Sequence, residues 1–381
     1  MAQDDKPVMS NRPISILFTI PNFITAGSGR AMLNIIERLN REKFAPAVCV
    51  LKKGGKLDQV VEALQIPFLE APFLVAAKPY GSLLRRARQA ARAFRPYQFQ
   101  LWHSFHYGDD YTEAIIARLA GAKAWVYTKK NMNWYRRAWQ VRTFLATRVA
   151  AQNSDMLGDF FASLLHKRKV RLIPRGVMTK QFTAQPTLQL RAALKIPEAV
   201  CLIGCVAQLL PVKGHPTLLA ALAQVPEAHL LLAGNASDAA YAGRLRQQTA
   251  DLQIEDRVTF LDFVEDIPAF LAEIDLFVLP TWARWRMEGC PVALLEAMAS
   301  GRACIATDVP GSRDLIEHGR RGWLVPPEDE AALAEAIHHL LAQPSRRVQL
   351  GQAAQVRVAQ QYTIEQEVAA HEAMYAEALG W

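Results

Sequence analysis

Two glutamates lie eight residues apart in the sequence EGCPVALLE, at positions 288 and 296. The Gly-Cys-Pro between them predicts the start of a helix, because proline suits the first helical turn, where its missing N–H costs nothing. Free backbone N–H groups at such a start bind hydroxyl or phosphate oxygens. Glu296, about a turn and a half into the helix, can accept two hydrogen bonds from a vicinal diol such as a ribose. A helix-end charge followed by an exposed glutamate is the alternative, since glutamates are common.

A second group lies in VAQLLPVKGHPTLLAAL, residues 206–222, where Lys213-Gly214 follows a predicted strand and precedes a predicted helix. A lysine at this point adds its cation to the positive field of the helix N-terminus, which suits a phosphate. Together with the two glutamates, Lys213 predicts a site for a ligand that carries both phosphate and a diol.

The elements that must position these groups alternate between strands and helices. Apolar and β-branched runs alternate with helical patterns over residues 14–129, and the alternation restarts after residue 180 and continues to 341. This order predicts an α/β fold with two parallel, doubly wound, Rossmann-like sheets. Open sheets of this kind bind ligands at the carboxyl ends of their strands, so we expect the site in a cleft between the two halves. The linker is expected near residues 174–186.

The composition agrees with two domains that have different surfaces. The 381 residues exceed one typical domain, and 51% hydrophobic against 21% charged residues excludes a disordered chain. The net charge of +8 combines +16 in residues 1–175 with −8 in residues 176–381. We expect the basic half to attract an anionic membrane surface, a phospholipid-linked acceptor or nucleic acid. A generally basic surface without a specific partner is the alternative.

The apolar segments and cysteines bear on where the protein resides. No 18 uncharged apolar residues run together, and the first 13 residues lack the apolar core of a secretory signal. The five cysteines stand mostly in apolar runs, which favours buried free thiols in a reducing compartment. These patterns predict a cytoplasmic protein, with peripheral attachment to the inner face of the cytoplasmic membrane as a further expectation.

The ordered motifs of the second half resemble those of a known family. After the Lys213-Gly214 loop follow HLLLAGNA, VTFLDFVED, DLFVLP, the E-x7-E pair and ACIATDVPGSRDLIEHGRRGWLVPPED. This set resembles the C-terminal domain of the retaining, GT-B-fold glycosyltransferases of group 1, or GT4 type, over residues 173–341. The resemblance is weaker over 14–159. It implies an N-terminal acceptor-binding domain (1–178), a C-terminal donor-binding domain (179–361), and a last helix (362–381) that packs back on the first domain.

The resemblance assigns roles to individual residues. Lys213 would bind the donor diphosphate, and Glu288 would grip the sugar hydroxyls; these two are the predicted catalytic residues. Glu296 would bind the nucleotide ribose. The other implied donor-binding residues are Gly27, Ser28 and Gly29 in a glycine-rich loop, Gln208, Gly234, Asn235, Phe263, Val264, Gly289, Cys290, Pro291 and Val292. The family generally needs no metal ion or cofactor, and the sequence shows no metal-ligand cluster. No protein nucleophile is expected.

The sequence departs from the family at three places. Gln208 stands five residues before Lys213, where the family usually carries an arginine, so one phosphate-directed cation is missing. The loop after Pro280 is about four residues longer than usual, and we hypothesise that its Arg284 or Arg286 replaces that charge; solvent-facing arginines are the alternative. Lys130 stands where the family often has a histidine near the donor sugar, and it is a candidate contact to phosphate or acceptor.

Other candidate contacts lie in the first half. His103 and His106 stand at the end of a predicted strand that faces the expected cleft, and they are candidates to bind acceptor hydroxyls, with structural histidines as the alternative interpretation. Residues 129–142 mix five cations with Trp134, Tyr135 and Trp139, and residues 85–95 add five arginines. Both segments suit a membrane interface or a lipid-phosphate acceptor. Solvated helix faces are the alternative, and a nucleic-acid site lacks any accompanying motif.

The sequence therefore predicts a retaining, metal-independent glycosyltransferase. It would move a sugar from a nucleotide-sugar donor to a saccharide or lipid-linked acceptor, in bacterial cell-surface polysaccharide or lipopolysaccharide synthesis. UDP is the favoured donor nucleotide and GDP the next. The alternatives are a sugar-nucleotide epimerase of the same fold and a degenerate member that binds nucleotide or sugar, or regulates a partner, without transfer.

Overall fold

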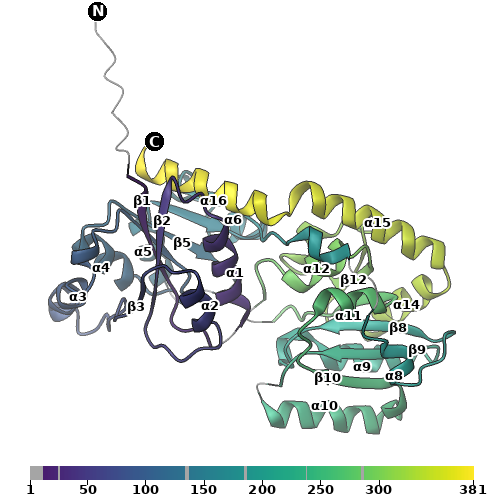
Figure 1. The fold of residues 1–381 in the computed structure, drawn as a ribbon. Coiled ribbons are helices and arrows are strands. Elements are labelled where there is room, and N and C mark those ends of the chain that lie inside the picture. Colours follow the sequence, from purple (N-terminus) through teal and green to yellow (C-terminus); the bar gives the residue numbers. More distant parts are fainter. Residues whose placement is uncertain (1–11, 25, 134–136, 184–186, 237, 285–286) are drawn as a thin grey trace, which may run out of the picture.

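The computed structural model describes residues 12–24, 26–133, 137–183, 187–236, 238–284 and 287–381. Two parallel sheets, each covered by helices on both faces, lie beside each other and are bridged by two long C-terminal helices (Figure 1). The predicted α/β class with two Rossmann-like halves is confirmed.

The first sheet has seven strands in the order β3-β2-β1-β4-β5-β6-β7. Its central strands carry almost unbroken apolar runs because helices cover both faces; β1 (ISILFT) has five of its six residues buried. The strands are β1 (Ile14–Thr19), β2 (Phe44–Val50), β3 (Phe68–Glu70), β4 (Leu101–Ser104), β5 (Ala124–Lys129), β6 (Arg148–Ala151) and β7 (Val170–Leu172).

The second sheet has six strands in the order β10-β9-β8-β11-β12-β13. In both sheets the chain reverses its direction of winding beside the first strand, which is where α/β folds place their ligands. The strands are β8 (Cys201–Val206), β9 (Ala228–Ala233), β10 (Val258–Asp262), β11 (Leu276–Leu279), β12 (Ala303–Thr307) and β13 (Trp323–Val325).

Helices connect the strands on both faces. Those of the first half are α1 (Ala26–Arg38), α2 (Asp58–Ala63), α3 (Leu83–Ala91), α4 (Thr112–Ala120), α5 (Ala138–Leu145), α6 (Asp155–Asp159) and α7 (Leu164–Lys167). Those that follow are α8 (Leu190–Ala193), α9 (His215–Ala223), α10 (Ala239–Asp251), α11 (Ile267–Glu273), α12 (Val292–Ala299), α13 (Ser312–Leu315), α14 (Glu330–Leu341), α15 (Pro344–Gln361) and α16 (Ile364–Leu379).

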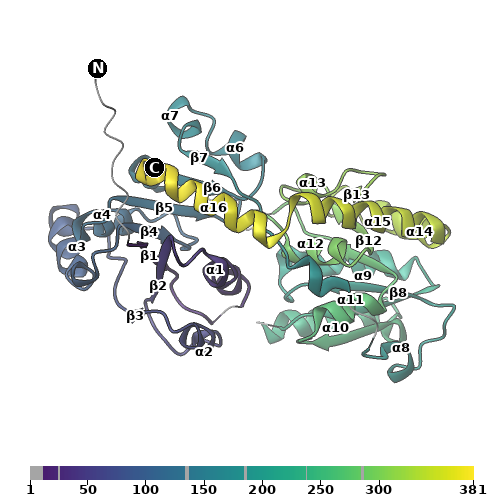
Figure 2. The same cartoon turned by 45° about the horizontal axis from the view of Figure 1, so that its top comes forward.

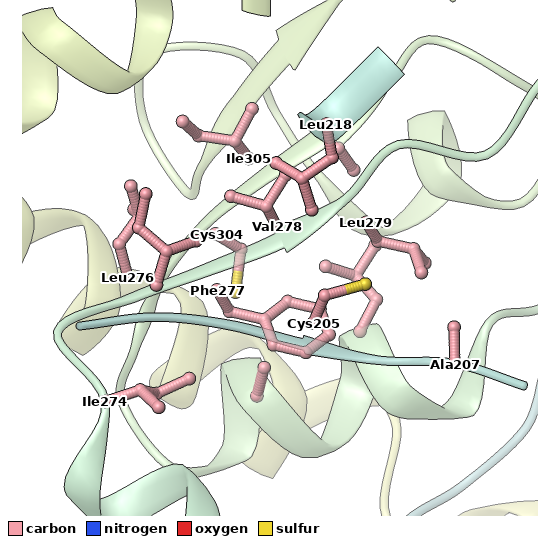
Figure 3. Close-up of a cluster of buried hydrophobic side chains, with 14 of the residues drawn as sticks. Cys205, Ala207, Leu218, Ile274, Leu276, Phe277, Val278, Leu279, Cys304 and Ile305 are labelled. Carbon is pink, nitrogen blue, oxygen red and sulfur yellow. The ribbon is translucent and has the colours of Figure 1, made fainter. Parts of the chain in front are cut away.

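The core of the second half is a continuous apolar cluster between sheet and helices. Figure 3 shows side chains of β11 and β12 packed with Cys205, Leu218 and Ile274. All five cysteines of the chain are free thiols, and four of them are buried. The sulfurs of Cys205 and Cys304 lie inside this cluster, where they act as small apolar groups.

The C-terminal helix α16 returns to the first half of the molecule, whereas α15 packs on α12 and β12 of the second (Figure 2). The return is fixed by a short parallel bridge, because Val177 N–H donates to Tyr362 O at 2.9 Å and Ile364 N–H donates to Val177 O at 3.0 Å. On α16, Tyr375 is fully buried against Phe18 and Phe44. No helix in the described parts of the chain combines the length and apolar run needed to cross a membrane.

Candidate active site

The two residues with predicted catalytic roles meet in the structure. Lys213 Nζ lies 2.7 Å from Glu288 Oε1. The lysine side chain is 13% exposed and the glutamate side chain 41%, so the pair is open to solvent on the glutamate side. A lysine held by one carboxylate can exchange that partner for a phosphate, so Lys213 can bind an anion once Glu288 is displaced.

Lys213 is positioned by a tight turn after β8. The 3₁₀ turn η4 (Pro211–Lys213) ends at Gly214, whose φ of 71° leads directly into α9. A Cβ on Gly214 would lie 1.8 Å from Pro280 O, so only glycine fits here. The turn therefore fixes Lys213 at the N-terminus of α9, as the sequence predicts, and beside the chain that leaves β11.

Glu288 stands in the loop between β11 and α12. Pro291 caps this helix, so α12 starts one residue later than the sequence predicts. Its cap makes no side-chain hydrogen bond, which leaves the N–H groups of the first turn available to a ligand. Glu296 lies on α12, partly buried, and burial raises its carboxyl pKa to about 7. The carboxyl is thus poised to lose its proton when a polar ligand arrives.

The Glu288 loop is also held by the first half of the molecule. Gly289 N–H donates to Lys130 O at 2.8 Å, and Met132 N–H donates to Met287 O at 3.1 Å. A Cβ on Gly289 would lie 2.7 Å from Met156 Cε and 2.9 Å from Lys130 O, so a larger residue would push the two halves apart. The loop that carries Glu288 is therefore shared between both sheets.

Asn153 completes this contact and was missed by the sequence analysis. Its side chain is fully buried; Nδ2 donates to Gly289 O at 2.8 Å, and Oδ1 accepts from Met156 N–H at 2.9 Å. The signal was the polar run QNSD directly after the short apolar strand β6, at the carboxyl edge of the sheet.

The remaining predicted donor-binding residues lie beyond the carboxyl ends of β1, β8, β9, β10 and β11. Gly234 N–H donates to Asp262 O at 2.6 Å, and Leu209 N–H donates to Asn235 O at 3.0 Å. These bonds bring the loops after β8, β9 and β10 together, with Gln208 and Phe263 exposed and Val264 partly buried. Cys290 is buried. Their part in binding a donor stays a prediction.

The glycine-rich segment differs locally from the prediction. Gly27, Ser28 and Gly29 form the first turn of α1 rather than a loop before it. Gly29 is buried against Phe23 and Leu57, whereas Gly27 is exposed. The first N–H groups of a helix have no partner within the helix, so a helical placement offers donors of the kind expected of the loop.

His103 is a core residue, contrary to its prediction as a ligand contact. Its side chain is fully buried, Nδ1 lies 2.7 Å from the Tyr375 hydroxyl, and Nε2 lies 2.9 Å from Thr128 Oγ1. Both nitrogens are occupied, and burial holds the pKa of His103 well below its usual range. The structural alternative is correct: His103 joins β4 to β5 and α16.

His106 and Lys130 lie close together beyond β4 and β5. Burial, reinforced by Arg142 and Lys130, lowers the pKa of His106 to about 3, and its Nδ1 is buried without a partner. Lys130 Nζ donates to Phe105 O and lies 5.6 Å from the Tyr107 ring centre. Burial, with Arg175 and Arg142 nearby, holds the pKa of Lys130 well below its usual range. A contact of either residue to phosphate or acceptor stays a prediction.

Arg284 is engaged by an acidic side chain. It pairs with Glu328, lies 4.8 Å from the Trp282 ring centre, and its side chain is 58% exposed. In this arrangement Glu328 neutralises the charge that was expected to replace the missing arginine. The solvent-facing alternative is closer to what the structure shows for Arg284. Arg286 lies outside the described residues.

The basic segment 129–142 is not a solvated stripe. Lys129 is 1% exposed, its Nζ donates to Asn131 O at 2.6 Å, and burial lowers its pKa to about 6. Arg142 is fully buried and donates to Ser104 Oγ at 3.0 Å. Lys129 and Arg142, two of the five cations of this segment, therefore belong to the interior. Trp134 and Tyr135 lie outside the described residues.

Among the described residues, no three His, Cys, Asp or Glu side chains gather into a group able to hold a metal ion. Two surface hollows, of about 420 and 390 Å³, lie along α15 and along α3, away from Lys213 and Glu288. The site is defined by its converging side chains and helix starts.

Two families match the chain and together cover most of it. The family described as Glycosyltransferase Family 4 matches residues 25–181, and that described as Glycosyl transferases group 1 matches residues 200–343. The chain belongs to the group 1, GT4-type glycosyltransferases. Lys213, Glu288 and Glu296 all fall within the group 1 match.

Two curated relatives of this chain are named as mannosyltransferases. The GDP-mannose-dependent alpha-(1-6)-phosphatidylinositol monomannoside mannosyltransferase of Mycobacterium tuberculosis is 30% identical over 201 residues, 50% of this chain and 51% of that protein. The lipopolysaccharide core biosynthesis mannosyltransferase LpcC of Rhizobium leguminosarum is 31% identical over 185 residues, 47% and 51% of the two chains. The chain thus spans about half the length of these relatives.

Solved structures agree on the fold over nearly the whole chain. Anabaena Alr3699/HepE, in complex with UDP and glucose, has a TM-score of 0.81 at 22% identity and covers 95% of this chain and 99% of its own. A glycosyltransferase from Rickettsia africae has a TM-score of 0.83 at 18% identity, covering 96% and 99%. The chain has the GT-B fold.

Proposed function

We propose that this protein transfers a sugar, with retention and without a metal ion, from a nucleoside-diphosphate sugar to a saccharide or lipid-linked acceptor. The observation that carries the proposal is the Lys213–Glu288 pair at 2.7 Å, set between the N-termini of α9 and α12 with Glu296 on the second helix. A cation and two helix starts suit the diphosphate, and two carboxylates suit the hydroxyls of sugar and ribose.

The chemistry follows from this charge distribution. The bond between the sugar C1 and the β-phosphate oxygen breaks, and the bonding electrons leave with the phosphate. The Lys213 ammonium and the α9 N-terminus stabilise that developing negative charge. The acceptor hydroxyl oxygen bonds to C1 from the face that the phosphate leaves, and the departing phosphate oxygen takes the hydroxyl proton. The step needs no protein nucleophile.

The comparisons guide the choice of substrates. A UDP-sugar is the first donor to test, because a neighbour of the same fold is solved with UDP and glucose. A GDP-sugar is the second, because a relative is named GDP-mannose-dependent. For the acceptor, two relatives are named for a phosphatidylinositol mannoside and for the lipopolysaccharide core, which favours a lipid-linked saccharide.

One observation favours a second candidate function. Gln208 is uncharged and Arg284 pairs with Glu328, so among the described residues Lys213 has no second cation established beside it. A family member that lacks a second cation beside this lysine could bind a nucleotide sugar without transferring the sugar. The two functions differ in whether the sugar–phosphate bond is cleaved.

Release of nucleoside diphosphate from UDP-glucose and GDP-mannose separates them. We expect slow release from one donor by the wild type, and a loss of about 100-fold or more in Lys213→Ala. Lys180→Ala, which removes an exposed lysine of η3 (Thr179–Thr183), is the matched control and should leave the rate unchanged. Donor binding without any release would favour the second function, and equal rates in both variants would refute the role of Lys213.

A further inference from the structure

Large apolar side chains are exposed together on two short helices of the first half. Leu164 and Leu165 on α7 are 83% and 71% exposed, and Phe144 on α5 is 68% exposed. Val141, three residues before Phe144 on α5, is 43% exposed. Single exposed apolar residues are ordinary, but four on neighbouring helices mark an interaction surface. We call these four residues the α5–α7 face.

Contacts between the two helices show that the four residues belong to one region. The Trp139 and His166 ring centres are 5.9 Å apart. Lys169, just beyond α7, donates from Nζ to Phe144 O at 2.6 Å and to Ala146 O at 2.8 Å at the end of α5. Thus α5 and α7 lie side by side, and in Figure 2 α7 stands at the outer edge of the molecule beside β7.

Cations surround this apolar face. Arg137 precedes α5, Lys167 ends α7 and Arg168 follows it; all three are exposed. No ion pair joins any of them to an acidic side chain in the described ranges. By contrast, Arg148 and Arg171 are held by Glu377 at 3.2 and 2.6 Å. The face is therefore apolar at its centre and positively charged at its rim.

We propose that the α5–α7 face docks on an anionic lipid surface. Apolar side chains that insert among acyl chains, beside cations at the depth of the headgroups, are the pattern of an interfacial anchor. A second copy of this chain is a poor occupant, because a self-complementary contact would bring Lys167 and Arg168 toward the same cations of its partner. The proposal concerns attachment only and does not depend on sugar transfer.

The arginine-rich helix α3 offers an anionic surface only positive charge. On α3, Arg85, Arg88 and Arg92 are exposed at or just beyond the helix, and the buried face consists of Ala87, Ala90 and Ala91. Leu84, at 45%, is the one large apolar side chain exposed within the bounds of α3. We therefore expect α3 to strengthen attraction to anionic lipid without providing the apolar insertion.

Co-sedimentation with vesicles tests the proposal. The probes are vesicles of phosphatidylcholine alone and of phosphatidylcholine mixed with phosphatidylglycerol. We expect the wild type to prefer the mixed vesicles, and Leu164→Ser/Leu165→Ser to bind them at least about tenfold more weakly. Lys167→Gln/Arg168→Gln should lose about tenfold or more on mixed vesicles only, because each surface cation contributes about a fivefold factor.

A matched control separates this face from apolar exposure in general. Val348→Ser/Val356→Ser removes two valines of α15 that are 57% and 54% exposed and should leave vesicle binding unchanged. Folding is checked by nucleoside-diphosphate affinity, which none of these variants should alter. No vesicle binding by the wild type would overturn the proposal, as would unchanged binding by the leucine variant. A dimer in sedimentation velocity that the leucine variant abolishes would instead assign the face to self-association.

Discussion

At the scale of single residues, Glu288 has two roles, one toward Lys213 and one toward the donor sugar. It holds Lys213 at 2.7 Å, and its loop is expected to grip the donor sugar. A phosphate that reaches Lys213 must displace this carboxylate, so the ion pair opposes binding of the nucleoside diphosphate while preserving the lysine geometry.

We predict that Glu288→Gln separates these two effects. Removing the negative charge frees Lys213, so affinity for the nucleoside diphosphate should rise a fewfold, whereas transfer should fall by about 100-fold as the sugar contact is lost. Calorimetric titration and a transfer assay on the same preparation measure both. Glu328→Gln, which frees Arg284 instead, is the control and should leave transfer within about twofold. Weaker nucleotide binding by Glu288→Gln would contradict the account.

Glu296 gives the site a pH dependence near neutrality. Its pKa is raised to about 7 by burial, so the unliganded carboxyl is protonated below that pH. The usual pKa of a glutamate carboxyl is 4.5, so between pH 4.5 and 7 the folded protein holds a proton on Glu296 that the unfolded chain has lost. The contribution of Glu296 to the free energy of unfolding therefore falls as the pH rises through this range. Binding works in the opposite direction, since only the ionised carboxylate accepts both ribose hydroxyls.

Nucleoside-diphosphate affinity should therefore rise about tenfold between about pH 6 and pH 8, beyond the change caused by the phosphate itself. Glu296→Gln cannot ionise and should lack this part of the rise. The phosphate titrates equally with both proteins, so the difference between their affinity profiles isolates Glu296. Parallel profiles would show that Glu296 does not meet the ribose as a carboxylate.

At the scale of elements, the turn from β8 into α9 determines where Lys213 lies. A Cβ on Gly214 would collide with Pro280 O, and the φ of 71° is itself unfavourable for other residues. Lys213 is therefore positioned by a glycine on its C-terminal side as much as by its own contacts.

Gly214→Ala should lower the free energy of unfolding by more than about 1 kcal/mol and weaken nucleoside-diphosphate binding, because the turn must open. Gly243→Ala lies inside α10, where an added Cβ meets no atom within 4 Å, and should stabilise the protein by about 0.5–1 kcal/mol. Thermal unfolding with and without nucleotide measures both. Equal melting temperatures for the two variants would contradict this description of the turn.

Helices and strands with long periodic patterns were predictable from the sequence. The run around β8, η4 and α9 lies where expected, and α12 starts within one residue of its expected position, because apolar periodicity, Gly214 and Pro291 all agree locally. The strands β6 and β7 were not predicted, since RVAA and VRL are too short to show a period. Their burial comes from neighbouring strands and helices.

Side-chain surroundings were less predictable than the elements. His103 stands in a segment with several polar residues, yet its side chain is buried against Tyr375, which is 272 residues away in sequence. Arg142 looked like a surface cation and is buried because Ser104 and carbonyl groups far along the chain accept its hydrogen bonds. Such partners depend on tertiary contacts, which a single sequence does not display.

At the scale of the whole molecule, the connection between the halves is a buried ionic cluster. Arg175 in the linker pairs with Glu367 of α16 at 2.9 Å, and Gly176 N–H donates to the other oxygen of Glu367 at 2.8 Å. Burial outweighs Arg175 and raises the pKa of Glu367. The cluster therefore mainly fixes the position of α16 against the linker, and it adds little to the net free energy of unfolding.

Arg175→Met alone should destabilise the protein by about 3–5 kcal/mol, because it leaves a buried carboxylate without its partner. Arg175→Met/Glu367→Leu should recover much of that loss. Arg320→Met, which breaks an exposed pair with Glu317, is the control and should change stability by less than about 1 kcal/mol. Thermal unfolding measures all three. A double variant as unstable as the single one would contradict this role for the cluster.

The central claim is that Lys213 and Glu296 form one site for a nucleoside-diphosphate sugar. Calorimetric titration of UDP and GDP into the metal-free wild type, Lys213→Ala and Glu296→Ala tests it most directly. The account predicts that one nucleotide binds the wild type and that each variant weakens it at least tenfold, while Lys180→Ala does not. Wild-type affinity retained in both site variants, or no binding of either nucleotide, would contradict it.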